Sequence, residues 1–162
     1  MPLDGMPPQP AAARMLPDVA MNAADGRAVR PGDYRHRKHL VVVVLPDAPA
    51  PYDPPILRAL ARRHVEFSEE NAEILAVLPP SAPWPPRPAV ADDCPFPVVQ
   101  DRDGALSCTL SGRRAPSTGT IAVHVADRYG EIFRTLAVTG ANPFPLEEVL
   151  AWVRFLERLC PE

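Results

Sequence analysis

The chain has 162 residues, enough for one domain with a sizeable core but too few for two. Hydrophobic residues make up 46% and charged residues 23%, values that are typical of a folded globular domain and that exclude a disordered or fibrous chain. Seventeen basic residues against twenty acidic ones give a net charge of −3, so the chain as a whole does not attract nucleic acid or an anionic membrane.

The first 23 residues are rich in Pro, Ala and Met and have no regular periodicity. We interpret residues 1–23 as an N-terminal arm and residues 24–162 as the folded domain. The arm has an early acidic residue and no continuous apolar stretch, which is not the pattern of a secretion signal. The longest clear apolar run, Leu40–Leu45, is far shorter than the roughly 20 residues of a membrane helix. We therefore expect a cytoplasmic protein without a membrane partner.

The first half of the domain has the pattern of a strand–helix–strand unit. After a short extended piece at Arg27–Arg30, the run Leu40–Leu45 is apolar on both faces and mostly β-branched, as in a central strand covered by helices. Asp53 can cap a helix that we expect to continue to about Asn71. The apolar face of that helix consists of Ile56, Leu57, Leu60, Ala61, His64 and Phe67. Glu73–Leu78 then predicts a second strand, parallel to the first.

The second half of the domain has the pattern of a hairpin followed by a helix. Val98–Asp101 leads into the turn DRDG, and a strand is expected at Thr120–Ala126. Gly130 suits a left-handed position in the turn before Ile132–Leu136, which predicts a hairpin. Apolar residues then recur at helical spacing over Pro145–Leu159. Together the two halves predict an α/β fold with a mixed central sheet and helices on both faces.

Four segments match a known family in the expected order. GRAVRPGDYRHRKHLVVVVL resembles the opening, PFPVVQDRDG the mid-chain segment, VADRYGEIFR the strand–turn–strand hairpin and EEVLAWVRFLERLCPE the closing helix of peroxiredoxin-like redoxins. These redoxins are the alkyl hydroperoxide reductase and thiol-specific antioxidant family. The resemblance extends from about Ala24 to the C-terminus, and it implies a thioredoxin-like fold in which βαβ is followed by ββα.

The catalytic positions depart from this family. The family's enzymes place a Cys in the first turn of the helix after the central strand, where backbone N–H groups and the helix dipole favour a thiolate. The corresponding segment, Pro46–Pro55, contains no Cys, Ser or Thr, and it includes Pro49, Tyr52 and the negatively charged Asp53. Alignment on the hairpin also places Ile121 where thioredoxins keep a cis-proline. We therefore expect no ordinary peroxidase chemistry at this degenerate site.

The cysteines are three in number and widely spaced, which predicts reduced thiols and not a disulfide framework or zinc site. Cys160 resembles a resolving cysteine in its position and context, and it is the candidate catalytic residue if any redox activity remains. Two carboxylates near Cys94 in the sequence, one of them Asp93, would raise its thiol pKa, and we expect an inert thiol there. For Cys108 we expect a partly buried packing role.

The run from Arg35 to His39 is the concentrated basic patch of the sequence. We interpret it as a solvated loop that enters a strand, and a weak anion or nucleic-acid contact remains the alternative. His36 and His39 lack the thiolate or carboxylate neighbours of a zinc set, so we expect neither a metal nor another cofactor. We interpret His124 as a core residue and Trp84 as a cover for the sheet edge.

Three functional hypotheses follow. The first is a redoxin-like protein that has lost peroxidase activity and serves as a scaffold, as a homodimer or with a protein partner. The second is a thiol-disulfide oxidoreductase or antioxidant protein acting through Cys160, which requires that thiol to be reactive. The third is the weak anion or nucleic-acid binder, which requires salt-sensitive binding through Arg35 and Arg37.

Overall fold

The computed structural model describes residues 15–46, 55–82, 84, 94–110, 119–139 and 143–159. The strands are β1 (Met21–Ala23), β2 (Ala28–Val29), β3 (His39–Val44), β4 (Ala72–Leu78), β5 (Val98–Gln100), β6 (Thr120–Ala126) and β7 (Ile132–Thr139). The helices are η1 (Pro31–Tyr34), α1 (Pro55–Arg62), α2 (His64–Glu69), α4 (Ala105–Leu110) and α5 (Leu146–Leu159). Among the described helices none is long and apolar enough to cross a membrane.

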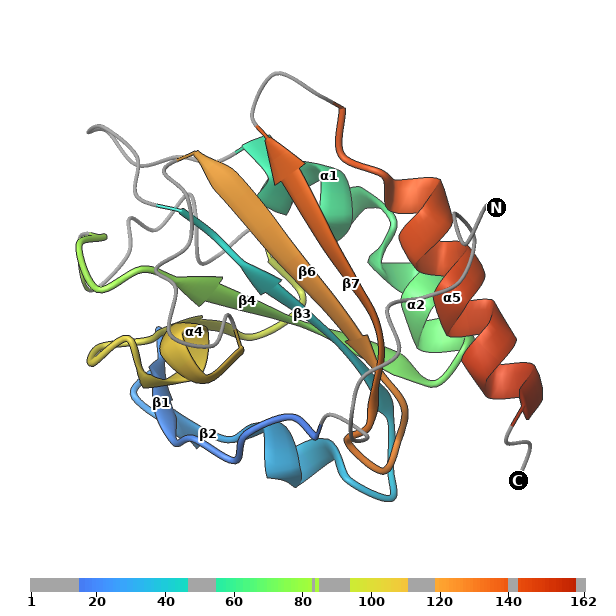
Figure 1. Ribbon diagram of the computed structural model, residues 1–162, viewed down its shortest axis with the longest axis horizontal. Helices are drawn as coiled ribbons and strands as arrows, with labels where there is room; N and C mark the ends of the chain where they lie inside the picture. Colours follow the sequence, from blue (N-terminus) through green and yellow to red (C-terminus); the bar gives the residue numbers. More distant parts are fainter. Residues whose placement is uncertain are drawn as a thin grey trace, which may run out of the picture.

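The strands form one mixed sheet in the order β2-β1-β5-β4-β3-β6-β7 (Figure 1). Strands β3, β4 and β5 run parallel, whereas β6 pairs antiparallel with both β3 and β7. Strand β1 pairs antiparallel with β5 and with β2. The predicted βαβ unit, the β6–β7 hairpin and the α/β architecture are therefore confirmed.

The central strand β3 is buried along its whole length because helices cover both faces of the sheet. Helices α1, α2 and α5 lie on one face, and α4 lies on the other (Figure 1). Val41 and Val43 point into the first layer, and Leu40 and Val42 point into the second. The strand that was predicted to be apolar on both faces thus contributes side chains to two apolar cores, one on each side of the sheet.

The predicted helix after β3 is divided in two at Arg63. Its N–H donates to the carbonyl oxygen of Leu60 at 3.1 Å, three residues earlier, and α2 begins at the next residue. Such a tightened turn interrupts the regular i to i−4 pattern of an α-helix. The predicted apolar face is nevertheless the buried one, with Ile56, Leu57, Leu60 and Phe67 in the core.

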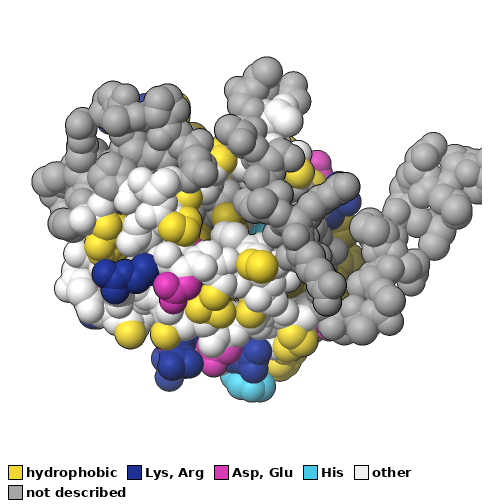
Figure 2. Space-filling model, turned by 60° about the vertical axis from the view of Figure 1, so that its left-hand side comes forward, with side chains coloured by type: hydrophobic (Ala, Val, Ile, Leu, Met, Phe, Trp, Pro, Cys, Tyr) yellow, Lys and Arg dark blue, Asp and Glu magenta, His cyan; other side chains and the backbone are white. Residues whose placement is uncertain are grey.

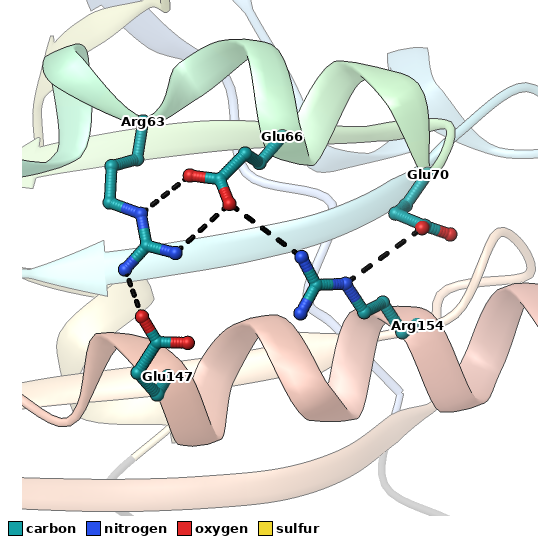
Figure 3. A network of polar contacts seen from close by, with 5 residues as sticks. All are labelled: Arg63, Glu66, Glu70, Glu147 and Arg154. Carbon is teal, nitrogen blue, oxygen red and sulfur yellow. Dashed lines mark hydrogen bonds and ion pairs between the residues drawn. The ribbon is translucent and has the colours of Figure 1, made fainter.

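A network of charges joins α2 to α5 on the outer surface (Figure 3). The guanidinium of Arg63 contacts the carboxylates of Glu66 and Glu147, with Nη2 at 2.9 Å from Oε1 of Glu66. Arg154 extends from α5 to Glu66 at 3.6 Å and to Glu70 at 3.9 Å. The hydrogen bonds from Arg63 hold the pKa of Glu66 below its usual value. These groups are solvent-accessible, so the network orients the helices more than it stabilises them.

The packed part of the chain begins earlier than the predicted boundary at residue 24. Met15 forms an antiparallel bridge with Glu131, and the N–H of Leu16 donates to the carbonyl oxygen of Gly130 at 2.8 Å. Leu16 is 3% exposed and belongs to the second core. The boundary is therefore corrected: Leu16 and β1 belong to the fold, because their apolar side chains fill the core against β5 and β7.

Helix α4 was not predicted, and a buried carboxylate accounts for it. Asp101 is 1% exposed, and its two oxygens accept the N–H groups of Leu106 at 3.2 Å and Ser107 at 2.9 Å. These bonds occupy N–H groups that the first turn of a helix leaves without partners. The expectation for Cys108 is also corrected, because the residue lies on the exposed side of α4.

Candidate functional site

The carboxyl end of β3 is where the sequence analysis located the degenerate catalytic position. Strand β3 leads to Pro46, and α1 begins at Pro55. Val44 pairs with Ala122 of β6, so the next residue, Ile121, lies at this same end of the sheet. Ile121 is partly buried against the first core. The structure therefore brings Ile121 to the end of β3 from which the degenerate segment leaves.

The remaining residues singled out for that site are not part of the described structure. Pro49, Tyr52 and Asp53 fall in the segment 47–54, and Cys160 follows α5; all four lie outside the described residues. Their assigned roles remain predictions from the sequence.

The amino end of β3 carries a group of buried polar residues. Arg128, 5% exposed, donates from Nη2 to Oε1 of Glu157 at 2.6 Å, and Asn71 donates to the other oxygen of that carboxylate. Nε2 of His39 lies 3.7 Å from the same Oε1, and His39 is fully buried. Glu157 therefore holds together residues from α5, β3 and the β6–β7 turn.

His39 is neutral in this environment at physiological pH. Burial lowers the pKa of His39 because it removes water from the charged imidazolium, and the positive charge of Arg128 lowers it further. The carboxylate of Glu157 opposes both effects. Neither ring nitrogen of His39 has a hydrogen-bond partner among the described residues. The titratable imidazole of His39 is therefore buried away from solvent.

A hollow of about 550 Å³ lies beside the amino-terminal half of β4. It exists because β5 begins pairing only at Val98, opposite Ala76, and leaves the earlier part of the β4 edge without a neighbouring strand. Ala76 donates its N–H to Pro97, but the N–H of Ile74, which points the same way, donates to Oε1 of Glu73 at 2.9 Å. The carboxylate of Glu73 thus accepts the backbone N–H that a neighbouring strand would otherwise accept at this edge of β4.

The charged and phenolic side chains that line this hollow come from the turn after β1, from η1 and from β4, and His64 of α2 contacts one of them. Nε2 of His64 donates to Oε1 of Glu73 at 2.7 Å, and both side chains are about 15% exposed. Burial raises the pKa of Tyr34 to about 12, and the negative charge of Glu73 contributes to the shift, so the phenol keeps its proton at neutral pH. Asp25 and Arg27 form an ion pair at 2.6 Å on the rim. The thiol-bearing residue Cys94 and the ring of Phe96 also line the hollow.

The basic run of the sequence does not form a continuous patch. His39 is buried at the start of β3, so the exposed part ends before it. His36 lies 5.6 Å from the ring of Tyr129, and its N–H donates to the carbonyl oxygen of Arg128. Among the described residues on the face shown in Figure 2, Lys and Arg side chains lie beside Asp and Glu side chains and form no extended basic field.

Two further sequence interpretations can be compared with the structure. His124 is 3% exposed with Nδ1 at 3.1 Å from Oγ1 of Thr135, which confirms a core histidine. Trp84 is partly buried against the first core. The sequence analysis missed Glu73 and Tyr34 as site residues. The available signal for Glu73 was a carboxylate near the start of an otherwise apolar strand.

Comparison with known proteins gives a consistent result. A model of the AhpC/TSA family matches residues 12–141. Similar solved structures include Plasmodium yoelii thioredoxin peroxidase I, with 17% identity over 92% of this chain and 95% of that chain and a TM-score of 0.70. Mycobacterium bovis AhpC has 19% identity, coverage of 93% and 95%, and a TM-score of 0.69. Xanthomonas campestris peroxiredoxin Q has 18% identity, coverage of 89% and 97%, and a TM-score of 0.68. No curated protein sequence matches the chain.

Proposed function

The chain belongs to the AhpC/TSA family, and we propose that it is a member that has lost peroxidase activity and acts as a binding scaffold. One observation carries this proposal. The βαβ and ββα elements are all present, yet the sequence between β3 and α1 contains no Cys, Ser or Thr. A peroxidatic reaction needs a thiolate nucleophile, and prolines and a carboxylate cannot supply one.

The scaffold role is supported by apolar surface on the last helix. Phe155 is 42% exposed and Leu159 is 52% exposed, and Trp152 packs edge-on against Phe155 at 5.7 Å between ring centroids. Aromatic side chains of this kind are enriched where proteins associate. We propose self-association as a homodimer in the cytoplasm. Light scattering at micromolar concentration tests it, and a monomeric mass would contradict it.

The loss of activity is tested by peroxide consumption with a thiol reductant in excess. The native protein and Cys160→Ser are compared with Plasmodium yoelii thioredoxin peroxidase I as the positive control. We expect both forms of this protein to match the buffer rate. Turnover by the native protein that Cys160→Ser abolishes would overturn the proposal in favour of an oxidoreductase acting through Cys160. Turnover that survives this substitution would also overturn it, and Cys94→Ser would then test the remaining lining thiol.

A further inference from the structure

The hollow beside β4 contains two polar groups that receive no hydrogen bond from the described part of the chain. Both hydrogen bonds to the Glu73 carboxylate, from His64 and from the backbone of Ile74, engage Oε1. Neither Oε2 of Glu73 nor the hydroxyl of Tyr34 has a hydrogen-bond partner among the described residues, although both residues line the hollow. The Glu73 side chain is only 14% exposed, and a carboxylate oxygen that receives no donor from the described residues is a natural acceptor for a ligand with N–H groups.

The charges of the lining decide which sign of ligand fits. Asp25 and Arg27 neutralise each other on the rim, and the hydrogen bonds from Arg27 hold the pKa of Asp25 below its usual value. Glu73 is the remaining charged side chain among the described lining residues, and its hydrogen bonds come from the imidazole of His64 and the backbone N–H of Ile74. An anionic ligand would be repelled by this carboxylate, whereas a cation with N–H donors would satisfy it.

The apolar part of the lining limits the shape of the ligand. Phe96, Pro97 and Val98 line the hollow together with Ala24 and with Ala23, whose strand pairs with β5. These side chains offer no hydrogen bonds, so a ligand gains there only by burying carbon. An apolar lining next to a carboxylate therefore fits a compact ligand that has an apolar body and a cationic nitrogen group at one end.

We propose that the hollow beside β4 binds a small organic cation, with a primary ammonium or amidinium-type group donating to Glu73 and Tyr34. This site is separate from the degenerate catalytic position. Glu73 lies beside Leu40, and Val44 is four residues further along β3, which corresponds to about 13 Å at about 3.3 Å per residue. The inference therefore stands whether or not peroxidase activity has been lost.

Binding is tested by amide chemical shifts of the ¹⁵N-labelled full chain, titrated with benzylamine and benzamidine. Benzyl alcohol and benzoate are the neutral and anionic controls. We expect saturable shifts around residues 23–27 and 94–98 with the two cations only, and affinity at least about tenfold weaker in Glu73→Gln. The exposed Glu69→Gln is the matched control and should bind as the native protein does. Equal binding of all four probes, or none, would overturn the proposal, as would unchanged affinity in Glu73→Gln.

A second readout uses the cysteines and does not need a substituted Glu73. Cys94 lines the hollow, whereas Cys108 is exposed on α4 and does not. Peptide mass spectrometry after timed alkylation should show that bound benzamidine slows modification of Cys94 at least about threefold and leaves Cys108 unchanged. Tyr34→Phe should weaken this protection while keeping the fold. Equal alkylation rates of Cys94 with and without saturating benzamidine would show that the cation does not bind in the hollow and would overturn the proposal.

Discussion

The two ends of β3 differ in the chemistry they carry. At the carboxyl end, the described residues Pro46 and Ile121 are apolar, and Ile121 packs against the first core. At the amino end, His39, Arg128 and Glu157 place titratable groups in the interior, and the hollow with Glu73 lies on the neighbouring strand. Polar groups are costly to bury, so their concentration at one end indicates where the molecule retains specific interactions.

The largest effect is expected when the buried guanidinium of Arg128 is removed from the amino end of β3. Arg128→Met keeps the length of the side chain but leaves the carboxylate of Glu157 without its 2.6 Å partner. Breaking a buried ion pair from one side typically costs about 3 kcal/mol or more in the free energy of unfolding. We expect a loss of that size in urea denaturation.

The matched control for this change is Arg134→Met. Arg134 pairs with Glu148 at 3.2 Å, but their side chains are 32% and 44% exposed. Solvent screens such a pair, so the expected loss is below about 1 kcal/mol. Similar losses for the two variants would mean that the amino end of β3 does not depend on its buried charges.

A smaller effect is expected in the pH dependence of stability. Because the pKa of His39 is lower in the folded state than its ordinary 6.5, the unfolded chain binds the proton more readily. The associated stability is therefore present above pH 6.5 and is lost as the pH falls through the folded-state pKa. Denaturation between pH 5 and 7.5 should show this loss, and His39→Leu should flatten it. His36→Leu, which changes an exposed ring, should keep the native slope, and an unaltered slope in His39→Leu would refute the assignment.

The smallest effect is expected for the surface network between α2 and α5. Arg63→Gln removes the contacts to Glu66 and Glu147, which lie in solvent and are screened by salt. We expect a slightly lower thermal midpoint at low ionic strength that merges with the native value at high salt. Arg62→Gln, on the exposed side of α1, is the control. A midpoint difference that survives high salt would show that Arg63 contributes through packing at the break between the helices.

Much of the sheet was predictable because its signals are local. The β-branched run at β3 and the turn around Gly130 specify strand and hairpin from neighbouring residues alone. Gly130 has φ +88°, and Oδ1 of Asp127 accepts the N–H groups of Tyr129 and Glu131, as the turn sequence predicts.

The parts that escaped prediction depend on distant contacts. Helix α4 has only six residues and is held by the buried carboxylate of Asp101. The hollow arises because β5 starts late along β4, and about twenty residues of chain separate the two strands, so no tight turn indicates where their pairing begins. The contact between His64 and Glu73 requires α2 to lie against the β4 edge. The roles proposed for Pro49, Tyr52, Asp53 and Cys160 remain predictions from the sequence.

The position of β3 between β4 and β6 also has a consequence during synthesis. Its parallel neighbour follows soon in the chain, but β6 emerges from the ribosome only after α1, α2, β4, β5 and α4. Until then, one edge of a strand with four consecutive valines stays open to other nascent chains. Translation speed and chaperone access over that interval should therefore govern how much of the protein reaches its folded state.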